Sequence, residues 1–195
     1  MKTLDRLLQG WRIRKASAHI PPGSRLLDVG CGDGALFRRL GSKLREGLGV
    51  DPALERRHEW DRFRLEPGTL RGLSRDMGLF DVITLLAVLE HVAEDQIGAF
   101  AAGCAGMLRP GGRLIVTVPS PRVDVILVGL RRLGLVEGIR LEEHHGFDPG
   151  RTRALFEEAG LELRRHGRFQ LGLNHLFVFE KPDPETATGG GRSRS

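Results

Sequence analysis

The residues best suited to chemistry lie in a glycine-rich stretch, residues 26–34, with the sequence LLDVGCGDG. Gly30, Gly32 and Gly34 allow the backbone to turn sharply and let a ligand approach without meeting Cβ atoms. The stretch contains an apolar run typical of a strand and precedes a helical segment that starts near Ala35. A ligand is therefore expected outside the carboxyl end of this strand, beside the first turn of the helix.

Carboxylates accompany these glycines and narrow the chemistry of the ligand. Asp28 and Asp33 lie within the stretch, and Asp51 ends the next apolar run, 21 residues after Gly30. An acidic side chain at Asp51 can accept hydrogen bonds from both ribose hydroxyls of an adenosine group. Two further carboxylates would repel a pyrophosphate but suit a cofactor that carries an ammonium and a sulfonium. The same glycines also fit a dinucleotide fingerprint, so by themselves they leave both cofactor classes open.

Histidines and one glutamate are the candidate proton acceptors. His91 follows the fourth strand-like run, at the carboxyl edge of the expected sheet, and Glu90 directly precedes it. His144 and His145 are adjacent, so they point to different sides of the chain and at most one is expected to face a cleft. For His175, in a run near the end of the chain, a structural role is favoured. No ligand spacing among these residues identifies a metal site, and none is predicted.

The elements that must position these residues alternate along the chain. After an N-terminal helix within residues 1–22, strands are predicted at 25–29, 47–50, 62–65, 80–86 and 112–118. Helices are predicted between them at 35–44, 54–60 and 93–108. This alternation is typical of βαβ units around a mostly parallel sheet that is covered on both faces. A last helix is predicted at 148–159. Two consecutive strands follow it at 161–168 and 174–180 and are expected to pair as an antiparallel hairpin.

Two segments fall outside this alternation. Residues 120–146 are rich in apolar side chains and are interpreted as an insertion, either a lid over a hydrophobic acceptor, a contact surface or an extra helix on the sheet. Residues 182–195 have no apolar core positions and predict a disordered tail. The chain is therefore expected to form one domain over residues 1–181.

Composition excludes several classes of protein. With 195 residues, 40% hydrophobic and 28% charged, the chain is globular rather than disordered, fibrous or transmembrane. The net charge of +5 would suit a nucleic-acid partner. However, only four of the 30 basic residues are lysine and the arginine pairs are scattered along the chain, so no nucleic-acid partner is expected. The two cysteines, Cys31 and Cys104, form no metal or disulfide pattern, and no signal segment is found, so a cytoplasmic protein is expected.

The ordered motifs resemble those of the class I S-adenosylmethionine-dependent methyltransferases. The stretch from Asp28 to Gly34 has that family's first motif, D-x-G-x-G-x-G. Further motifs follow in the expected order, namely GVD at 49–51, FDVI at 80–83, LEHV at 89–92 and LRPGGRL at 108–114. Together they cover about residues 23–181, and the LEHV element is similar to that of ubiquinone-biosynthesis-type O-methyltransferases.

This resemblance implies a fold, a cofactor and a site. The fold is a Rossmann-like, doubly wound α/β sheet of seven strands in the order 3-2-1-4-5-7-6, with strand 7 antiparallel. The cofactor is S-adenosyl-L-methionine, with S-adenosyl-L-homocysteine as product. The candidate catalytic residues, chosen from their positions along the chain, are His91, His144 and His145. The implied cofactor-binding residues are Asp28, Gly30, Cys31, Gly32, Gly34, Asp51, Pro52, Thr69, Leu70 and Leu86.

One position departs from the family pattern. Many relatives end strand three with Gly-Asp, whose carboxylate accepts the adenine amino group, whereas this chain has Gly68-Thr69. A neutral acceptor forms a weaker hydrogen bond than a charged one, so cofactor affinity is expected to be lower, or Arg75 and Asp76 to take part.

The function expected from these features is methyl transfer to a small or lipophilic molecule at oxygen. The end of the fourth strand, LLAV at 85–88, lacks the Asn/Asp-Pro-Pro-Tyr type of motif that resembles amino-group methylation of nucleobases or glutamine. An NAD(P)-dependent oxidoreductase is disfavoured by Asp33 and by the absence of tyrosine, and a non-catalytic cofactor-binding scaffold is the third possibility. Residues 120–142 are a candidate peripheral membrane or homodimer contact.

Overall fold

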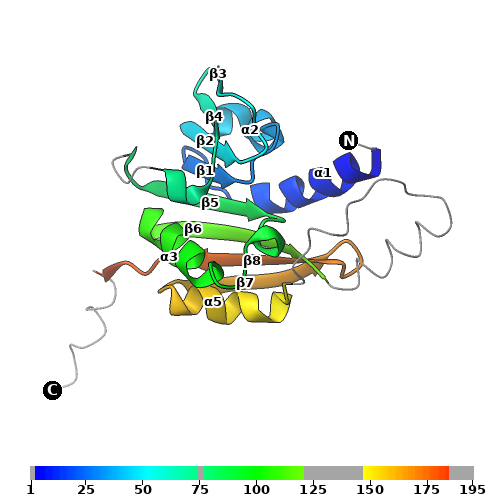
Figure 1. Ribbon diagram of the computed structural model, residues 1–195, viewed down its shortest axis with the longest axis vertical. Coiled ribbons are helices and arrows are strands. Elements are labelled where there is room, and N and C mark those ends of the chain that lie inside the picture. The colour runs from blue at the N-terminus through cyan, green and yellow to red at the C-terminus, as the bar shows by residue number, and fades with distance from the viewer. Residues whose placement is uncertain (1–2, 74–76, 121–146, 185–195) are drawn as a thin grey trace.

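The computed structural model describes residues 3–73, 77–120 and 147–184, which fold into one twisted sheet with helices on both faces (Figure 1). Within these residues the sheet has eight strands in the order β3-β4-β2-β1-β5-β6-β8-β7. The strands are β1 (Arg25–Val29), β2 (Glu46–Asp51), β3 (His58–Trp60), β4 (Phe63–Pro67), β5 (Phe80–Leu86), β6 (Leu108–Pro119), β7 (Glu162–Phe169) and β8 (Asn174–Glu180). The prediction of a Rossmann-like, mostly parallel α/β sheet is thus confirmed.

The helices connect these strands and cover them. The α-helices are α1 (Thr3–Ser17), α2 (Ala35–Leu40), α3 (Ile97–Met107) and α5 (Thr152–Glu158). Short 3-10 turns extend or replace them at η1 (Gly41–Lys43), η2 (Leu70–Gly72), η4 (Leu89–His91) and η6 (Pro149–Arg151). No helix in the described part of the chain is long and apolar enough to cross a membrane.

The core lies in two layers, one on each side of the sheet. One hydrophobic cluster joins α3 and α5 to the sheet, for example through Cys104 and Phe156, and the other joins α1 and α2, through Ala16 and Phe37. Successive side chains of a strand point to opposite faces of the sheet. Leu26 therefore belongs to the cluster with α1 and α2, and Leu27 to the cluster with α3 and α5. This explains why the central strands are apolar almost throughout, as the sequence indicated.

The C-terminal strands pair as expected. β8 is antiparallel both to β6 and to β7, whereas the pairs β4–β2, β2–β1, β1–β5 and β5–β6 are parallel. The bounds of β1, β5 and β8 are those predicted from the sequence. Because β8 is antiparallel to β6, the start of β8 lies beside the end of β6, and Asn174 pairs with Pro119.

The prediction of seven strands was wrong by one edge strand. Residues 58–60, expected to end a helix, form β3, which pairs antiparallel with β4 through Trp60 and Phe63. Asp61 adopts a left-handed backbone (φ 49°) that reverses the chain between the two strands. The Trp60 ring packs at 5.7 Å from the Phe63 ring, so a contact made across the turn overrides the local helical tendency.

Several predictions fall outside the described residues. Of the proposed insertion, residues 121–146 are not described, and neither are residues 185–195 of the proposed tail. The division of the chain into a core domain, a lid and a disordered tail therefore stays a prediction.

Candidate functional site

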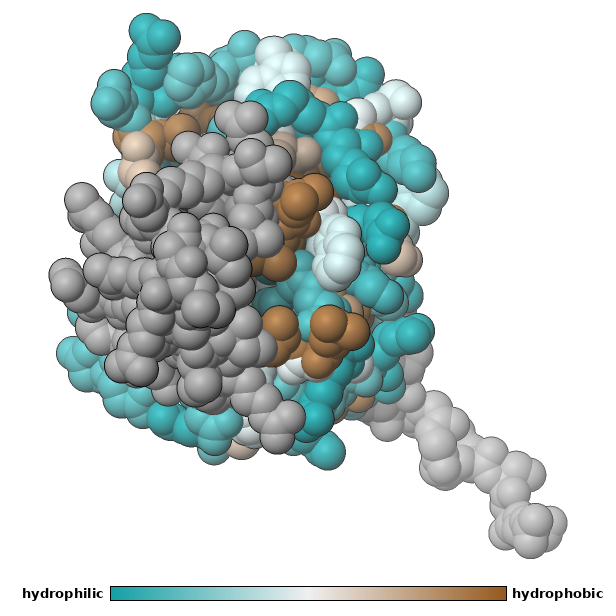
Figure 2. Space-filling view, turned by 90° about the vertical axis from the view of Figure 1, so that its right-hand side faces the viewer, coloured by the Kyte–Doolittle hydropathy of each residue, from teal (hydrophilic) through white to brown (hydrophobic). Residues whose placement is uncertain are grey.

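The glycine-rich turn lies at the carboxyl edge of the sheet, between β1 and α2. Figure 2 views the molecule from the side toward which β5 and β6 point. Gly30 has a φ of +74°, and a Cβ atom there would lie 2.7 Å from a methyl group of Val88. Its N–H donates to the carbonyl oxygen of Val50 at 2.8 Å, which fixes the turn against the end of β2. A side chain at this position is therefore excluded both by backbone conformation and by space.

Asp51 joins the end of β2 to this turn. Its carboxylate accepts hydrogen bonds from the backbone N–H groups of Gly32 and Ala53, each at 2.8 Å. The side chain is half-buried and lines a cavity at the same edge. Since two backbone donors fix its orientation, Asp51 is placed to accept further hydrogen bonds from hydroxyl groups in that cavity.

Asp28 is a buried carboxyl group near the end of β1. It is 3% exposed, and the Thr84 hydroxyl of β5 donates to its Oδ1 at 2.6 Å. Burial raises the pKa of Asp28 to about 7, the negative charge of Asp51 adds to this, and the Thr84 hydrogen bond opposes it. A nearby cation would favour the ionised form of Asp28.

Two cavities meet at this edge of the sheet. The larger, about 650 Å³, is bounded by the ends of β1 and β2, the 68–71 segment and the start of α3. The smaller, about 340 Å³, lies between α1, α2 and η4 and reaches Asp28. Both are lined by Gly30, Ala87 and His91, so the two cavities adjoin at these three residues. Their volumes are in the range of small-molecule sites in proteins.

The residues proposed for cofactor binding divide between the two cavities. Asp28, Cys31 and Leu86 line the smaller one, as does Gly30. The larger one is lined by Gly30 again and by Asp51, Pro52, Thr69 and Leu70. The Thr69 hydroxyl does not cap η2, which begins at Leu70. Ser74, Arg75 and Asp76 lie outside the described residues, so a part for Arg75 or Asp76 stays a prediction.

Two of the glycines have other roles in the structure. Gly32 lines neither cavity, and its N–H holds Asp51. Gly34 precedes α2 with a φ of +78°, and a Cβ there would lie 2.9 Å from the Trp60 ring. Both therefore shape the turn rather than surround the cavities.

Asp33 does not join the other carboxylates. It is exposed, forms an ion pair with Arg38 at 2.6 Å and lines neither cavity. The expectation that Asp28 and Asp33 together present negative charge to the ligand is therefore wrong for Asp33. It lies at the start of α2, where its carboxylate accepts a hydrogen bond from the Ala35 N–H at 3.2 Å.

Ala87 is a site residue that no sequence motif indicated. It follows β5 with a φ of 61°, a left-handed conformation that is rare outside glycine, and its N–H donates to the Thr117 carbonyl oxygen at 3.0 Å. This bend ends β5, and Ala87 itself lines both cavities. Unusual backbone of this kind is concentrated at functional sites. An alanine gives no sequence signal for it.

His91 is the one predicted catalytic residue that the structure describes. It ends η4, lines both cavities, and its backbone N–H donates to the Val88 carbonyl oxygen at 3.0 Å. Glu90 is 4% exposed and lines the smaller cavity. His144 and His145 lie outside the described residues. His175, for which a structural role was favoured, stacks against His166 on β7.

Cys31 is a packing residue with an unreactive thiol. Burial, together with the charges of Asp28 and Asp51, raises the pKa of its thiol far above the ordinary value. A Cβ atom on Gly49 would lie 2.6 Å from the Cys31 sulfur, which shows how closely it packs on β2. In the described residues, no group of three histidine, cysteine or acidic side chains could hold a metal ion.

Helix α1 contributes residues that the motifs did not reveal. Gln9, Arg12 and Ile13 line the smaller cavity opposite η4. The sequence predicts their segment only as an N-terminal helix. No motif marks them, because the side of α1 that faces the cavity depends on how the helix packs against α2.

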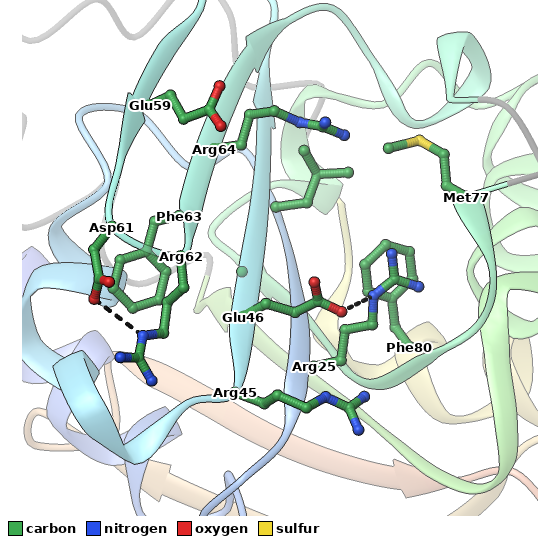
Figure 3. A pocket seen from close by; sticks show the side chains of 12 residues that line it. Arg25, Arg45, Glu46, Glu59, Asp61, Arg62, Phe63, Arg64, Met77 and Phe80 are labelled. Carbon is green, nitrogen blue, oxygen red and sulfur yellow. Dashed lines mark hydrogen bonds and ion pairs between the residues drawn. The ribbon is translucent and has the colours of Figure 1, made fainter.

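A further cavity, about 390 Å³, lies at the amino edge of the sheet, away from the glycine-rich turn (Figure 3). Its arginines are paired with acids, for example Arg25 with Glu46 at 2.6 Å and Arg62 with Asp61 at 3.0 Å. The Arg25 guanidinium also lies over the Phe80 ring, 4.5 Å from its centroid. These charges are engaged in contacts within the fold.

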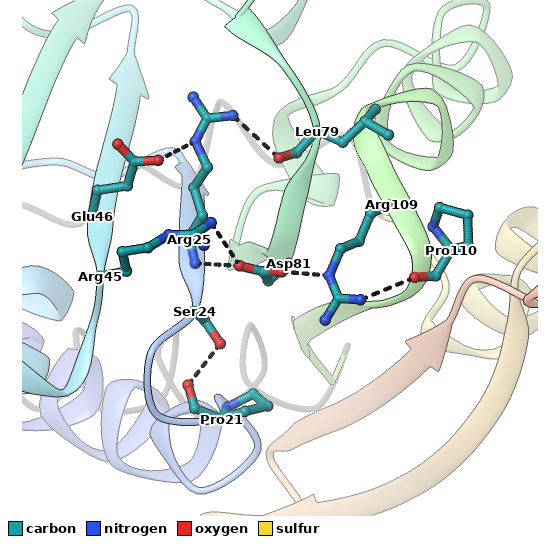
Figure 4. A network of polar contacts seen from close by, with 9 residues as sticks. All are labelled: Pro21, Ser24, Arg25, Arg45, Glu46, Leu79, Asp81, Arg109 and Pro110. Atoms are coloured by element: carbon teal, nitrogen blue, oxygen red, sulfur yellow. Dashed lines mark hydrogen bonds and ion pairs between the residues drawn. The ribbon is translucent and has the colours of Figure 1, made fainter.

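Asp81 organises the same amino edge (Figure 4). It accepts hydrogen bonds from the Arg25 backbone N–H at 2.6 Å and from the Arg109 guanidinium, and it lies 3.4 Å from the Arg45 guanidinium. The acidic residue of the FDVI motif thus joins the starts of β1, β2, β5 and β6. It has a structural role at the edge opposite the candidate site.

Comparison with known proteins identifies the family. A model of the methyltransferase domain family matches residues 2–166. The chain is 34% identical over 161 residues to the ubiquinone biosynthesis O-methyltransferase of Burkholderia pseudomallei, which covers 76% of this chain and 68% of that protein.

Solved structures share the fold. The N-methyltransferase NodS of Bradyrhizobium japonicum, in complex with S-adenosyl-L-homocysteine, superposes with a TM-score of 0.62 at 18% identity, covering 93% of this chain and 89% of that one. The 1,6-didemethyltoxoflavin-N1-methyltransferase of Burkholderia thailandensis gives a TM-score of 0.64 at 23% identity, with 88% and 79% covered. The chain therefore belongs to the methyltransferase domain family, and its resemblance to class I S-adenosylmethionine-dependent methyltransferases is confirmed.

Proposed function

We propose that this protein transfers a methyl group from S-adenosyl-L-methionine to an oxygen atom of a small or lipophilic molecule. The observation that carries the proposal is the meeting of two cavities at Gly30, Ala87 and His91. One cavity is lined by the oriented carboxylate of Asp51, and the other reaches the buried carboxyl of Asp28.

The residues present fit the cofactor. In the proposed arrangement, Asp51 accepts hydrogen bonds from the ribose hydroxyls, while Thr69 and Leu70 border the adenine. Asp28, whose burial is unfavourable for an isolated charge, becomes ionised opposite the ammonium group. The cofactor supplies an electrophilic methyl group and leaves as a neutral thioether, so the protein contributes mainly alignment.

His91 is proposed as the group that accepts a proton from the acceptor hydroxyl. It borders both of the cavities through which the cofactor is proposed to extend, so it is proposed to lie near the sulfonium that connects the ribose at Asp51 to the part carrying the ammonium at Asp28. A hydroxyl nucleophile must lose a proton, and an imidazole is suited to take it near neutral pH. His144 and His145 remain alternative bases.

Support for oxygen as the methylated atom comes from the O-methyltransferase relative at 34% identity. The two structural neighbours described above are N-methyltransferases, but at 18% and 23% identity they share only the fold. The acceptor is proposed to be small or lipophilic, with no nucleic acid as partner, and residues 120–142 are proposed to contact a membrane or a second copy. We also propose a cytoplasmic location, consistent with the buried free thiols of Cys31 and Cys104.

Isothermal titration with S-adenosyl-L-homocysteine tests the cofactor site. The variant Asp51→Ala is expected to weaken binding by ~1–3 kcal/mol, because a charged hydrogen-bond acceptor is lost. The matched control is Asp33→Ala, since that carboxylate lines neither cavity. Equal effects of the two substitutions would contradict the placement of the site.

Incubation with isotopically labelled cofactor and a cell extract, followed by mass spectrometry, tests the reaction and identifies the methylated atom. The variant His91→Gln is expected to lower kcat by about 100-fold or more without weakening S-adenosyl-L-homocysteine binding. Loss of binding in this variant would assign His91 to the cofactor pocket instead. Label found on nitrogen would overturn the proposed oxygen acceptor.

A further inference from the structure

Three exposed apolar side chains, those of Leu7, Trp11 and Leu171, lie near one another at one end of the molecule. In the described residues, the large hydrophobic side chains that stand exposed are Leu7 at 59%, Trp11 at 47%, Leu79 at 50% and Leu171 at 101%. Leu7 and Trp11 are four residues apart on α1 and so share one face of the helix. Leu171 lies in the turn between β7 and β8, and Leu79 stands apart, directly before β5.

The β7–β8 turn is held against α1. The side-chain amide of Gln170 donates to the Leu8 carbonyl oxygen at 3.2 Å. Trp11 and Phe169 line a shallow groove of about 200 Å³ between the helix and the end of β7. We call the exposed side chains of Leu7, Trp11 and Leu171, with the cations beside them, the α1–turn surface.

The backbone of this turn is unusual. Gln170 and Leu171 have φ values of 52° and 56°, a left-handed conformation that residues other than glycine rarely adopt, here in two successive positions. Gln170 is buried at 7% exposure and also accepts a hydrogen bond from the Asn174 amide, so the turn is anchored. Leu171 is thereby held fully in solvent, where an apolar side chain contributes nothing to the fold.

Cations border these apolar side chains. Arg14, Lys15 and Arg168 line the same groove as Trp11, and none has an ion-pair partner within the parts of the chain that the structure describes. This differs from the amino edge, where arginines are paired with acids. Exposed leucine side chains, a tryptophan and cations without ion-pair partners among the described residues are together complementary to the interface of a bilayer that contains anionic lipids.

We propose that the α1–turn surface docks on a membrane that contains anionic lipids. Leu7, Trp11 and Leu171 enter the interfacial layer, and Arg14, Lys15 and Arg168 bind headgroup phosphates. The other side of the same helix lines the smaller cavity through Gln9, Arg12 and Ile13, so docking places the width of the helix between that cavity and the bilayer. If the proposed function is correct, a lipophilic acceptor reaches the site from the membrane; the docking itself does not depend on the reaction.

Vesicle sedimentation with the full chain tests the docking. The protein is expected to sediment with vesicles of phosphatidylcholine mixed with phosphatidylglycerol, and much less with phosphatidylcholine alone. Raised salt is expected to weaken the binding, because counterions screen exposed charges. In the Trp60→Phe variant, where Trp11 is the remaining tryptophan, the mixed vesicles are expected to shift fluorescence emission to shorter wavelength.

Matched substitutions locate the contact. Leu171→Asp is expected to weaken vesicle binding by about tenfold or more, whereas Leu79→Asp at the opposite edge should leave it unchanged. Lys15→Gln is expected to weaken it by roughly fivefold, whereas Lys43→Gln, an exposed lysine in η1, should not.

Three outcomes would overturn the proposal. The first is absence of sedimentation with the mixed vesicles, and the second is an equal loss of binding in Leu171→Asp and Leu79→Asp. The third is a concentration-dependent dimer in analytical ultracentrifugation that Leu171→Asp dissociates, which would make the surface an interface between copies of this chain. Because no cofactor is present in these experiments, their failure is distinct from failure of the proposed reaction.

Discussion

At the scale of single residues, the candidate site depends on carboxylates in different environments. Asp51 is oriented by two backbone N–H groups and remains half-buried, whereas Asp28 is enclosed and has a raised pKa. Asp33, only five positions from Asp28, pairs with Arg38 on the surface. Residue type alone therefore does not decide which acidic group serves the ligand; burial and local partners do.

The raised pKa of Asp28 predicts a pH dependence of stability without cofactor. The folded state holds a proton up to about pH 7, whereas the unfolded chain releases it near 4. The folded state thus binds more protons in that window, so the free energy of unfolding is expected to fall as pH rises through it. Asp28→Asn should remove this fall and stabilise the protein at pH 8, by on the order of 2–4 kcal/mol.

Urea unfolding at a series of pH values checks this prediction. The exposed residue Asp33 supplies the matched control, since Asp33→Asn should keep the wild-type fall in stability between pH 4 and 7. An Asp28→Asn profile parallel to that of the wild type would show that Asp28 is not the titrating group.

At the scale of elements, the two edges of the sheet have different tasks. At the carboxyl edge, the β1 and β5 ends turn through Gly30 and Ala87 in left-handed conformations and leave room for cavities. At the amino edge, the Asp81 carboxylate joins neighbouring strands (Figure 4). Packing the strands firmly at one edge lets the other carry loops with strained backbone.

Asp81→Asn is expected to lower the free energy of unfolding by ~1–3 kcal/mol, because it removes charge-assisted hydrogen bonds from a half-buried site. Burial would raise the pKa of Asp81, but the Arg25 N–H and the Arg109 guanidinium outweigh it and lower the pKa. The stability that the Asp81 carboxylate contributes is therefore present at neutral pH and is lost as the pH falls through its lowered pKa.

Denaturation of Asp81→Asn at neutral and acidic pH checks this, with Asp61→Asn as the control. Asp61 is a more exposed carboxylate, 63% accessible in its ion pair with Arg62, and should change stability by less than about 0.5 kcal/mol. The difference between Asp81→Asn and wild type should narrow as pH falls. A constant difference at all pH values would contradict the role given to the Asp81 charge.

At the scale of the whole molecule, the two faces of the sheet are packed separately. Helix α5 closes one of them, with the Phe156 ring 5.1 Å from that of Phe179 on β8. Neither ring lines either cavity of the candidate site. Global stability and ligand binding should therefore be separable by substitution in this layer.

Phe156→Ala is expected to lower the free energy of unfolding by ~3–5 kcal/mol, because it leaves a cavity in a fully buried layer. The affinity for S-adenosyl-L-homocysteine should stay within about twofold of wild type under conditions where the variant is folded, since the site lies at the sheet edge. Urea unfolding and calorimetric titration measure the two quantities.

The control for this variant is Leu79→Ala, in which half of the removed side chain was already exposed. It should change stability by less than about 0.5 kcal/mol. A large loss of cofactor affinity in Phe156→Ala would show that the packing of α5 is coupled to the cavities.

The sequence by itself determined the α/β class, the bounds of β1, β5 and β8, and the position of the glycine-rich turn. These features follow from local signals. Burial on both faces demands apolar strands, and a sharp turn demands glycine. The positions of Asp28 and Asp51 near the ends of strands also follow from these local signals.

Only the tertiary structure decided the rest. It made residues 58–60 a strand, turned Asp33 toward Arg38, gave Ala87 a left-handed backbone and placed one face of α1 beside the smaller cavity. The Ala87 bend and the placement of α1 depend on parts of the chain that are distant in sequence, whereas β3 and the Asp33–Arg38 pair depend on contacts between near neighbours; none of these contacts leaves a periodicity or a characteristic residue type. The carboxyl edge of the sheet could be predicted as the place of the site, but the full set of side chains that line its cavities could not.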